Sequence, residues 1–227
     1  MAIPGDLTIT DDVPRAFAAR VIDAFRTRPG DTFSIALSGG ETARACYERL
    51  AASAGSQVDW WKVDVYWGDE RCVPHDHEDS NYLLAREALL DRVGAANATH
   101  LMRCAEGPDP YQLRLGDLGR IDVIHLGMGA DGHVASLFPG SAALEADPGR
   151  LVAMNSDPSG ANPYERMTLT LAGIARANQV VVTVTGESKA EALAAVAAGD
   201  SLPAARIDAH HVTWLVDPAA ASLLPDT

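Results

Sequence analysis

The fold of this chain is decided by the stretch Ile121-Asp-Val-Ile-His-Leu-Gly-Met-Gly-Ala-Asp-Gly-His-Val-Ala-Ser-Leu-Phe-Pro-Gly140. Its first part is mostly apolar, which predicts a buried strand over residues 121–126. The glycines that follow at positions 127, 129 and 132 let the backbone approach a ligand closely. Asp131 and His133 lie among these glycines. Because open α/β sheets bind ligands in the loops after their strands, we expect a functional site here.

Strand and helix signals alternate along the rest of the chain. Short apolar or β-branched runs predict further strands over residues 33–37, 63–67, 166–171, 179–185 and 212–216. Amphipathic or alanine-rich segments predict helices over residues 11–27, 43–54 and 79–93, just before residue 119, and between residues 189 and 199. This alternation predicts a three-layer α/β fold, modified Rossmann-like, with a mainly parallel sheet and helices on both faces.

The segment 141–163 lacks such signals and is rich in Pro, Gly, Ser and Asp. We expect an irregular connection that covers the site. Strand and helix signals continue after it, so it is not a linker between domains. The chain 1–227 is therefore expected to form a single domain.

Charge and cysteine content exclude several classes of protein. The formal charge of -13 over 227 residues disfavours binding to nucleic acid or anionic lipid. No apolar run has the length of a membrane span. The three cysteines, Cys46, Cys72 and Cys104, are widely spaced, which predicts reduced thiols in a cytoplasmic protein rather than a disulfide or a zinc site.

Three other predicted strands end in polar loops. These loops contain Ser38-Gly39-Gly40-Glu41-Thr42, Asp69-Glu70-Arg71 and Gly186-Glu187-Ser188-Lys189. A glycine-rich turn before a helix suits a phosphate, although it is equally typical of a tight turn, and a run of charges is usually a solvated loop. The carboxyl ends of parallel strands gather at one edge of a sheet, so we expect these loops to meet the Asp131–His133 loop.

The glycine loop allows three interpretations. Gly127, Gly129 and Gly132 fit a dinucleotide-binding pattern, but Pro139 ends the segment too soon for the required helix. A metal site built from Asp131 and His133 with His75, His77 or His125 is less favoured, because His125 alternates with apolar residues and reads as a core residue. The third interpretation is acid–base chemistry on a phosphorylated small molecule, and it accounts for all four loops. Histidine can act as the base near neutral pH.

These motifs resemble those of the 6-phosphogluconolactonases, in the glucosamine/galactosamine-6-phosphate isomerase superfamily. The resemblance rests on residues 127–140, on the loops at 38–42, 68–71 and 186–189, and on Asp79-Ser-Asn-Tyr82 and Glu165-Arg-Met-Thr168. It implies hydrolysis of 6-phosphoglucono-δ-lactone to 6-phosphogluconate in the pentose phosphate pathway, with no metal and no cofactor. Its partner would be a small sugar-phosphate lactone, with no nucleic acid or membrane, and the protein would be a monomer or a weak homo-oligomer.

The resemblance also implies roles for individual residues. His133 would be the general base and Asp131 would orient or charge-stabilise it. Arg166 would contact the substrate or the developing oxyanion. The phosphate and the rest of the substrate would be bound by the remaining site residues, Ser38, Gly39, Gly40, Thr42, Asp69, Arg71 and Lys189.

One departure from the family pattern, one open contact and two rival functions remain. The family usually has proline where this chain has Ala43, and the adjacent Arg44 either contacts phosphate or points to solvent. Glucosamine-6-phosphate deaminases share the glycine loop, but they have glutamate at the position of Phe138 and tyrosine at that of Arg71. A sugar-phosphate-binding regulator without turnover is the other alternative, which the intact Asp131–His133 pair disfavours.

Overall fold

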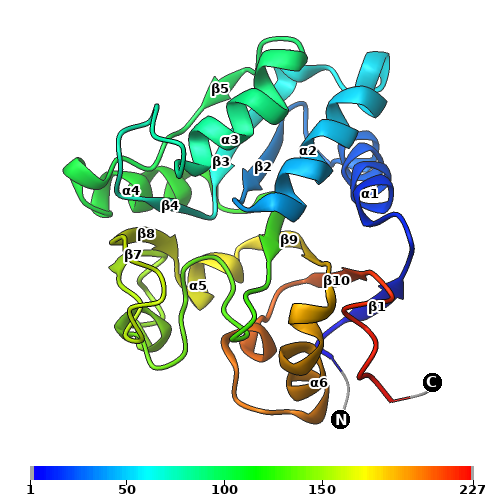
Figure 1. Cartoon of the computed structure of the whole chain (residues 1–227). Coiled ribbons are helices and arrows are strands. Elements are labelled where there is room, and N and C mark those ends of the chain that lie inside the picture. Colours follow the sequence, from blue (N-terminus) through cyan, green and yellow to red (C-terminus); the bar gives the residue numbers. More distant parts are fainter. Residues whose placement is uncertain (1–2, 226–227) are drawn as a thin grey trace.

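A seven-stranded parallel sheet forms the centre of the computed structural model, which describes residues 3–225 (Figure 1). Its order is β1-β10-β9-β6-β2-β3-β5. The strands are β1 (Asp6–Ile9), β2 (Phe33–Leu37), β3 (Val63–Trp67), β5 (Ala98–Thr99), β6 (Ile121–Gly127), β9 (Ala177–Val184) and β10 (His211–Val216). Every residue of β2 is buried, because helices cover both faces of a parallel sheet and its inner strands are apolar throughout.

Helices lie on both sides of this sheet, as the sequence predicts. They are α1 (Val13–Thr27), α2 (Glu41–Ala54), α3 (Asn81–Ala88), α4 (Asp109–Leu118), α5 (Leu171–Ile174) and α6 (Ala190–Ala198). The chain moves toward β5 through α1, α2 and α3 and returns toward β10 through α4, α5 and α6. Since crossovers between parallel strands are right-handed, the two directions place the two sets of helices on opposite faces. The predicted fold class is confirmed.

The reversal of direction fixes where a ligand binds. The chain leaves β2 toward one edge of the sheet and leaves β6 toward the other, and these two strands are neighbours. The loops that follow them therefore diverge and open a crevice at the carboxyl edge of the sheet. These loops are the Ser38–Thr42 turn and the glycine loop with Asp131 and His133.

The helix α1 shows how closely the sequence determines a local element. The Asp12 side chain caps it by accepting a hydrogen bond from the Arg15 N–H at 3.0 Å, and Pro14 occupies its first turn. The predicted apolar face, which includes Phe17 and Phe25, is buried against the sheet and α2.

A second, three-stranded antiparallel sheet was not predicted. It consists of β4 (Asp69–Arg71), β8 (Arg166–Leu169) and β7 (Val152–Asn155), in that order. The prediction of an irregular 141–163 is thus wrong in part, since β7 and a 3₁₀ turn at Ala142–Glu145 lie within it. The charged run at residues 69–71 is also a strand rather than a loop. Both strands are short, and pairing with β8 stabilises them where local composition does not.

A disulfide joins Cys72 and Cys104, whose Cα atoms are 5.5 Å apart, so the prediction of three reduced thiols is wrong. Cys72 directly follows β4 and Cys104 begins a 3₁₀ turn, Cys104–Glu106, before α4. The two residues are 32 positions apart in sequence, and only the tertiary fold brings them together. Cys46 is a buried free thiol.

Nearly all of the buried apolar residues form one hydrophobic cluster that extends from Ile3 to Ala220. Both sheets contribute to it, with Val123 from β6 and Met167 from β8 among its fully buried members. Between residues 3 and 225, no helix has the length and apolar character needed to cross a bilayer.

Candidate active site

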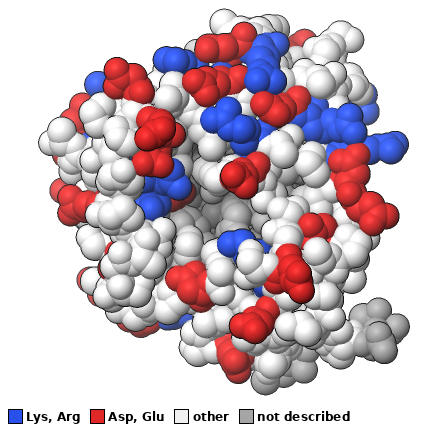
Figure 2. Space-filling model, viewed as in Figure 1, with Lys and Arg blue, Asp and Glu red and all other residues white. Residues whose placement is uncertain are grey.

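A cleft of about 620 Å³ lies at the carboxyl ends of the central strands. Figure 2 shows this face of the molecule hollowed near its middle, with both basic and acidic side chains around the hollow. The cleft is lined by most of the residues that the sequence predicts for the site: Ser38, Gly39, Gly40, Thr42, Asp69, Arg71, His133, Arg166 and Lys189. The remaining predicted residue, Asp131, contacts His133 from the side.

The Asp131 carboxylate holds the His133 ring by its Nδ1 atom. The Oδ1–Nδ1 distance is 2.6 Å, and the same oxygen accepts the His133 backbone N–H at 3.2 Å. A carboxylate at Nδ1 favours the tautomer with its proton on that nitrogen, so Nε2 becomes the basic nitrogen. Burial acts to raise the pKa of Asp131, but the hydrogen bonds and charge of His133 outweigh it and lower that pKa.

The glycine loop is shaped to admit this pair. A Cβ at Gly129 would overlap both the His133 ring and the Asp131 carboxylate, so only glycine fits there. The loop is closed by hydrogen bonds from the Gly129 N–H to the His133 carbonyl at 2.9 Å and from the Gly132 N–H to the Gly129 carbonyl at 3.0 Å. Phe138 packs against the His133 ring, with centroids 4.9 Å apart. The imidazole is therefore held in one orientation.

The turn after β2 presents the N-terminus of α2 to the cleft. Gly40 is the N-cap of that helix and has φ +95°, which favours glycine. The hydroxyls of Thr42 and Thr185 are hydrogen bonded at 2.6 Å and join this turn to the loop after β9. Lys189 lies in that loop at the start of α6. The arrangement combines free backbone N–H groups, a helix dipole and a cation, which suits an anion.

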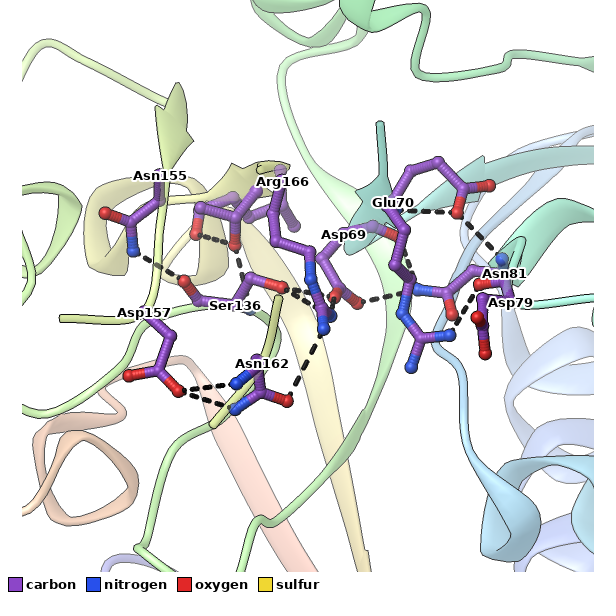
Figure 3. A network of polar contacts seen from close by, with 12 residues as sticks. Asp69, Glu70, Asp79, Asn81, Ser136, Asn155, Asp157, Asn162 and Arg166 are labelled. Carbon is purple, nitrogen blue, oxygen red and sulfur yellow. Dashed lines mark hydrogen bonds and ion pairs between the residues drawn. The ribbon is translucent and has the colours of Figure 1, made fainter. Parts of the chain in front are cut away.

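Arg166 supplies a buried positive charge from the small sheet. Arg166 is 5% exposed, and Figure 3 shows its guanidinium directed toward Asp69, Ser136 and Asn162. Nη1 is 3.8 Å from the Asp69 Oδ2 and 3.4 Å from the Ser136 hydroxyl, and Nη2 donates to Asn162 at 3.4 Å. Burial lowers the pKa of Arg166, against the opposing effect of Asp69. A guanidinium nevertheless keeps its charge in proteins.

Asp69 is fully engaged by protein side chains. It is 4% exposed; its Oδ2 accepts the Ser136 hydroxyl at 2.6 Å and its Oδ1 accepts from the Asn81 amide at 3.2 Å. The Asn81 side chain also fills the space that a Cβ at Gly39 would need. Asp69 thus connects Arg166 to the anion-binding turn.

The neighbouring Glu70 holds α3 in place. Its carboxylate accepts the backbone N–H groups of Asn81 at 2.7 Å and Tyr82 at 2.8 Å, which satisfies the N-terminus of that helix. Burial raises the pKa of Glu70, although these N–H groups oppose the rise. Arg71 then donates from Nη1 to the Asp79 carbonyl at 2.6 Å while lining the cleft. The run Asp69-Glu70-Arg71 therefore both holds α3 and lines the cleft, through Asp69 and Arg71.

Other residues considered in the sequence lie elsewhere. Arg44 pairs with Glu87 at 3.4 Å and does not line the cleft. His125 is a fully buried core residue, as expected. His75 and His77 lie outside the cleft, and across residues 3–225 no three His, Cys, Asp or Glu side chains cluster as metal ligands.

Sequence reasoning missed several residues that line the cleft. They are Asn162, Thr183, Thr185 and, by its side chain rather than its motif, Asn81. Asn162 lies in the segment predicted to cover the site, where Asp157 accepts its backbone N–H at 3.0 Å and its side-chain amide at 2.8 Å (Figure 3). An Asp five residues before an Asn is the signal that was available, and it is too common to identify a site alone.

Comparisons with known proteins identify the family of this chain. The family model for glucosamine-6-phosphate isomerases/6-phosphogluconolactonase matches residues 8–216. A 6-phosphogluconolactonase of Mycobacterium tuberculosis is 37% identical over 212 residues, which are 84% of this chain and 85% of that protein. One from Nostoc sp. is 39% identical over 211 residues, 85% of each chain.

The fold agrees as well. The structure of 6-phosphogluconolactonase from Trypanosoma cruzi superposes with a TM-score of 0.83 at 25% identity and covers 100% of this chain and 99% of that one. The chain therefore belongs to the family of glucosamine-6-phosphate isomerases and 6-phosphogluconolactonases.

Proposed function

We propose that this protein is a lactone hydrolase that converts 6-phosphoglucono-δ-lactone to 6-phosphogluconate in the oxidative pentose phosphate pathway, without metal or cofactor. The observation that carries the proposal is one cleft that holds both an oriented carboxylate–imidazole pair, Asp131 and His133, and an anion-binding turn with nearby cations. The names of the relatives support the same substrate.

In this proposal the phosphate binds at the N-terminus of α2. Backbone N–H groups of the Ser38–Thr42 turn and the Thr42 hydroxyl donate to it, and Arg71 and Lys189 neutralise its charge. These charges are local, because the chain as a whole is strongly negative. Binding the phosphate at one end of the cleft places the lactone ring toward His133.

Hydrolysis then requires one base and one stabilising charge. His133 Nε2 removes a proton from a water as its oxygen attacks the lactone carbonyl carbon. The tetrahedral oxyanion faces the Arg166 guanidinium, whose position in a buried network makes it effective without reorganisation. Collapse of the intermediate breaks the ring C–O bond, and the imidazolium returns its proton to the departing ring oxygen. Asp131 stabilises the imidazolium between these two transfers.

Asp69 acts in this scheme on Arg166 rather than on the phosphate. A buried carboxylate near a phosphate would repel it, whereas beside Arg166 it fixes the guanidinium with help from Ser136. Asn162 holds the other guanidinium nitrogen. The three contacts leave Arg166 one orientation in the cleft.

The decisive assay follows freshly generated 6-phosphoglucono-δ-lactone against its spontaneous hydrolysis with chelator present, beside ammonia release from glucosamine 6-phosphate. We expect lactone hydrolysis that survives chelator and no ammonia. Ammonia release without lactone hydrolysis would overturn the proposal in favour of a deaminase. Activity in neither assay would favour a binding protein without turnover.

A further inference from the structure

His125 is a buried histidine that the proposed reaction does not use. It lies on β6, is 0% exposed, and both of its ring nitrogens are hydrogen bonded. Nδ1 is 2.9 Å from the Tyr47 hydroxyl on α2, and Nε2 is 2.9 Å from the Thr183 hydroxyl on β9. Phe17 covers the ring, with centroids 4.3 Å apart. A polar side chain so completely satisfied in a core has its position fixed.

The protons in this network follow one consistent pattern. Burial lowers the pKa of His125 to about 3, so its ring is neutral and carries a single N–H. The Tyr47 hydroxyl accepts the Ser38 N–H at 2.6 Å and lies 3.1 Å from the Ser38 carbonyl, to which it donates. Its proton is then used, so His125 Nδ1–H donates to Tyr47 and Nε2 accepts from Thr183. In this arrangement both ring nitrogens of His125 and the Tyr47 hydroxyl have hydrogen-bond partners.

The network fixes the backbone of Ser38. Ser38 is the first residue after β2 and begins the turn that ends at Thr42. The Tyr47 hydroxyl bonds both the N–H and the carbonyl of Ser38, and so holds the two peptide groups on either side of this residue, just beyond the end of the strand. At the other end of the turn, Thr42 is bonded to Thr185, two residues after Thr183. One end of the turn is therefore tied to β9 through Tyr47 and His125, and the other end is tied to the loop directly after β9.

We propose that His125, acting through Tyr47, is a positioning residue for the anion-binding turn. This inference rests on the proposed function, in which the turn receives the substrate phosphate. His125 touches no substrate; it fixes the Tyr47 hydroxyl, which fixes the Ser38 peptide. Loss of the network loosens the turn and weakens phosphate binding, while the Asp131–His133 pair and Arg166 keep their own supports.

The test compares a phosphorylated substrate with a non-phosphorylated one. Tyr47→Phe removes only the hydroxyl and leaves the Ser38 N–H without its partner, so KM for 6-phosphoglucono-δ-lactone should rise about 10-fold. We expect kcat to change by less than about 2-fold, within the range of a neutral substitution. The kcat/KM for glucono-δ-lactone, which has no phosphate, should stay unchanged. Equal losses with both lactones, or a loss in kcat alone, would overturn the inference.

Two substitutions of His125 separate its nitrogens. His125→Asn keeps an amide near the position of Nδ1, which faces Tyr47, whereas His125→Gln keeps one near Nε2, which faces Thr183. If His125 acts through Tyr47, KM for 6-phosphoglucono-δ-lactone should be closer to the wild-type value in His125→Asn than in His125→Gln. In the double variant Tyr47→Phe/His125→Gln, KM should not exceed that of Tyr47→Phe, because the path is already broken. A lower KM in His125→Gln than in His125→Asn, or additive effects, would contradict this.

A second tyrosine provides a matched control for general destabilisation. The Tyr111 hydroxyl bonds the backbone of Trp67 at the end of β3: it accepts the Trp67 N–H at 2.8 Å and donates to the Trp67 carbonyl at 3.0 Å. Tyr111→Phe should lower the thermal midpoint about as much as Tyr47→Phe without the selective rise in KM. The same selective rise in KM in Tyr111→Phe would show that the loss of any such tyrosine–backbone hydrogen bond produces it, and would contradict a specific role for Tyr47. If the wild-type protein were inactive on both lactones, the proposed function itself would be refuted. If the wild-type protein were active but KM did not change in Tyr47→Phe, only the positioning role of His125 and Tyr47 would be refuted.

Discussion

The two sheets meet at the cleft but contribute to it in different ways. The large parallel sheet provides the anion-binding turn, which follows the fully buried β2, and the loop with Asp131 and His133, which follows the largely buried β6. The small antiparallel sheet provides Arg71 and Arg166 from strands of three and four residues. Backbone geometry thus positions one half of the site, and side-chain hydrogen bonds position the other. Substitutions in the two halves of the site should therefore differ in how they change kcat, KM and stability.

The largest effect is expected from the parallel-sheet half. His133→Ala should lower kcat by roughly 10²–10⁴-fold, the contribution of a general base, with little change in substrate binding. Initial rates over a range of lactone concentrations would measure both. His75→Ala, which lies outside the cleft, is the control and should keep wild-type kcat. An unchanged kcat in His133→Ala would remove this residue from the mechanism.

The next effect tests the antiparallel-sheet half. Arg166→Met should lower kcat by about 10²–10³-fold, the value of a preorganised charge at an oxyanion. It should also lower the free energy of unfolding by about 3 kcal/mol, because Asp69 then lacks its buried cation. Steady-state kinetics and urea unfolding would separate these losses.

Arg71 provides the comparison within the same sheet. Arg71→Met should mainly raise KM for the phosphorylated lactone, by about 10-fold, since in the proposed function it removes a charge-assisted contact with phosphate. If Arg166→Met and Arg71→Met gave the same pattern of kcat and KM, the division of labour between the two arginines would be wrong.

A smaller effect should follow from opening the disulfide. Cys104→Ser should lower the free energy of unfolding by about 2–4 kcal/mol, as is typical of a lost cross-link. Because Cys72 directly follows Arg71, KM for the phosphorylated lactone should rise as well, by less than in Arg71→Met. Reductant should reproduce both changes in wild type. A further change when reductant is added to Cys104→Ser would show that another group responds.

The smallest effect concerns the pH dependence of stability. The pKa of Asp131 is lowered in the folded protein, so this group stabilises the fold above its unfolded pKa, about 3.9, and that stabilisation is lost as pH falls below it. The Asp131 side chain is 44% exposed, so screening limits the contribution to under about 1 kcal/mol. Asp131→Asn should therefore flatten the decline in the urea midpoint between pH 5 and pH 3, a range chosen to span that value. An identical decline in both proteins would assign it to other carboxylates.

The sequence predicted the parallel half of the molecule well, for a physical reason. The β-branched run that forms β9 and the apolar run that forms β6 carry their own strand signal, and glycines mark where each loop turns toward the ligand. The site residues of this half lie in the loops after β2, β6 and β9. Knowing the strands therefore located Ser38, His133 and Lys189 together.

The antiparallel half was predicted less well because its structure depends on distant partners. β7 and β4 are too short to be recognised without β8, and Cys72 meets Cys104 only in the folded chain. His125 was recognised as a core residue, but its partner Tyr47 is 78 positions away, and no local pattern connects the two. Side-chain networks of this kind are properties of packing, which periodicity does not report.

The edge of the large sheet has a consequence for the order in which the protein folds. β1, at residues 6–9, pairs only with β10, at residues 211–216, along the register from Asp6–Thr213 to Ile9–Val216. During synthesis, β1 leaves the ribosome long before β10 and must wait for it before the two strands can pair. The inner strands β2 and β3 are close in sequence and can associate much earlier. Docking of the N-terminal strand is thus a closing step of folding, and it joins the two ends of the described chain.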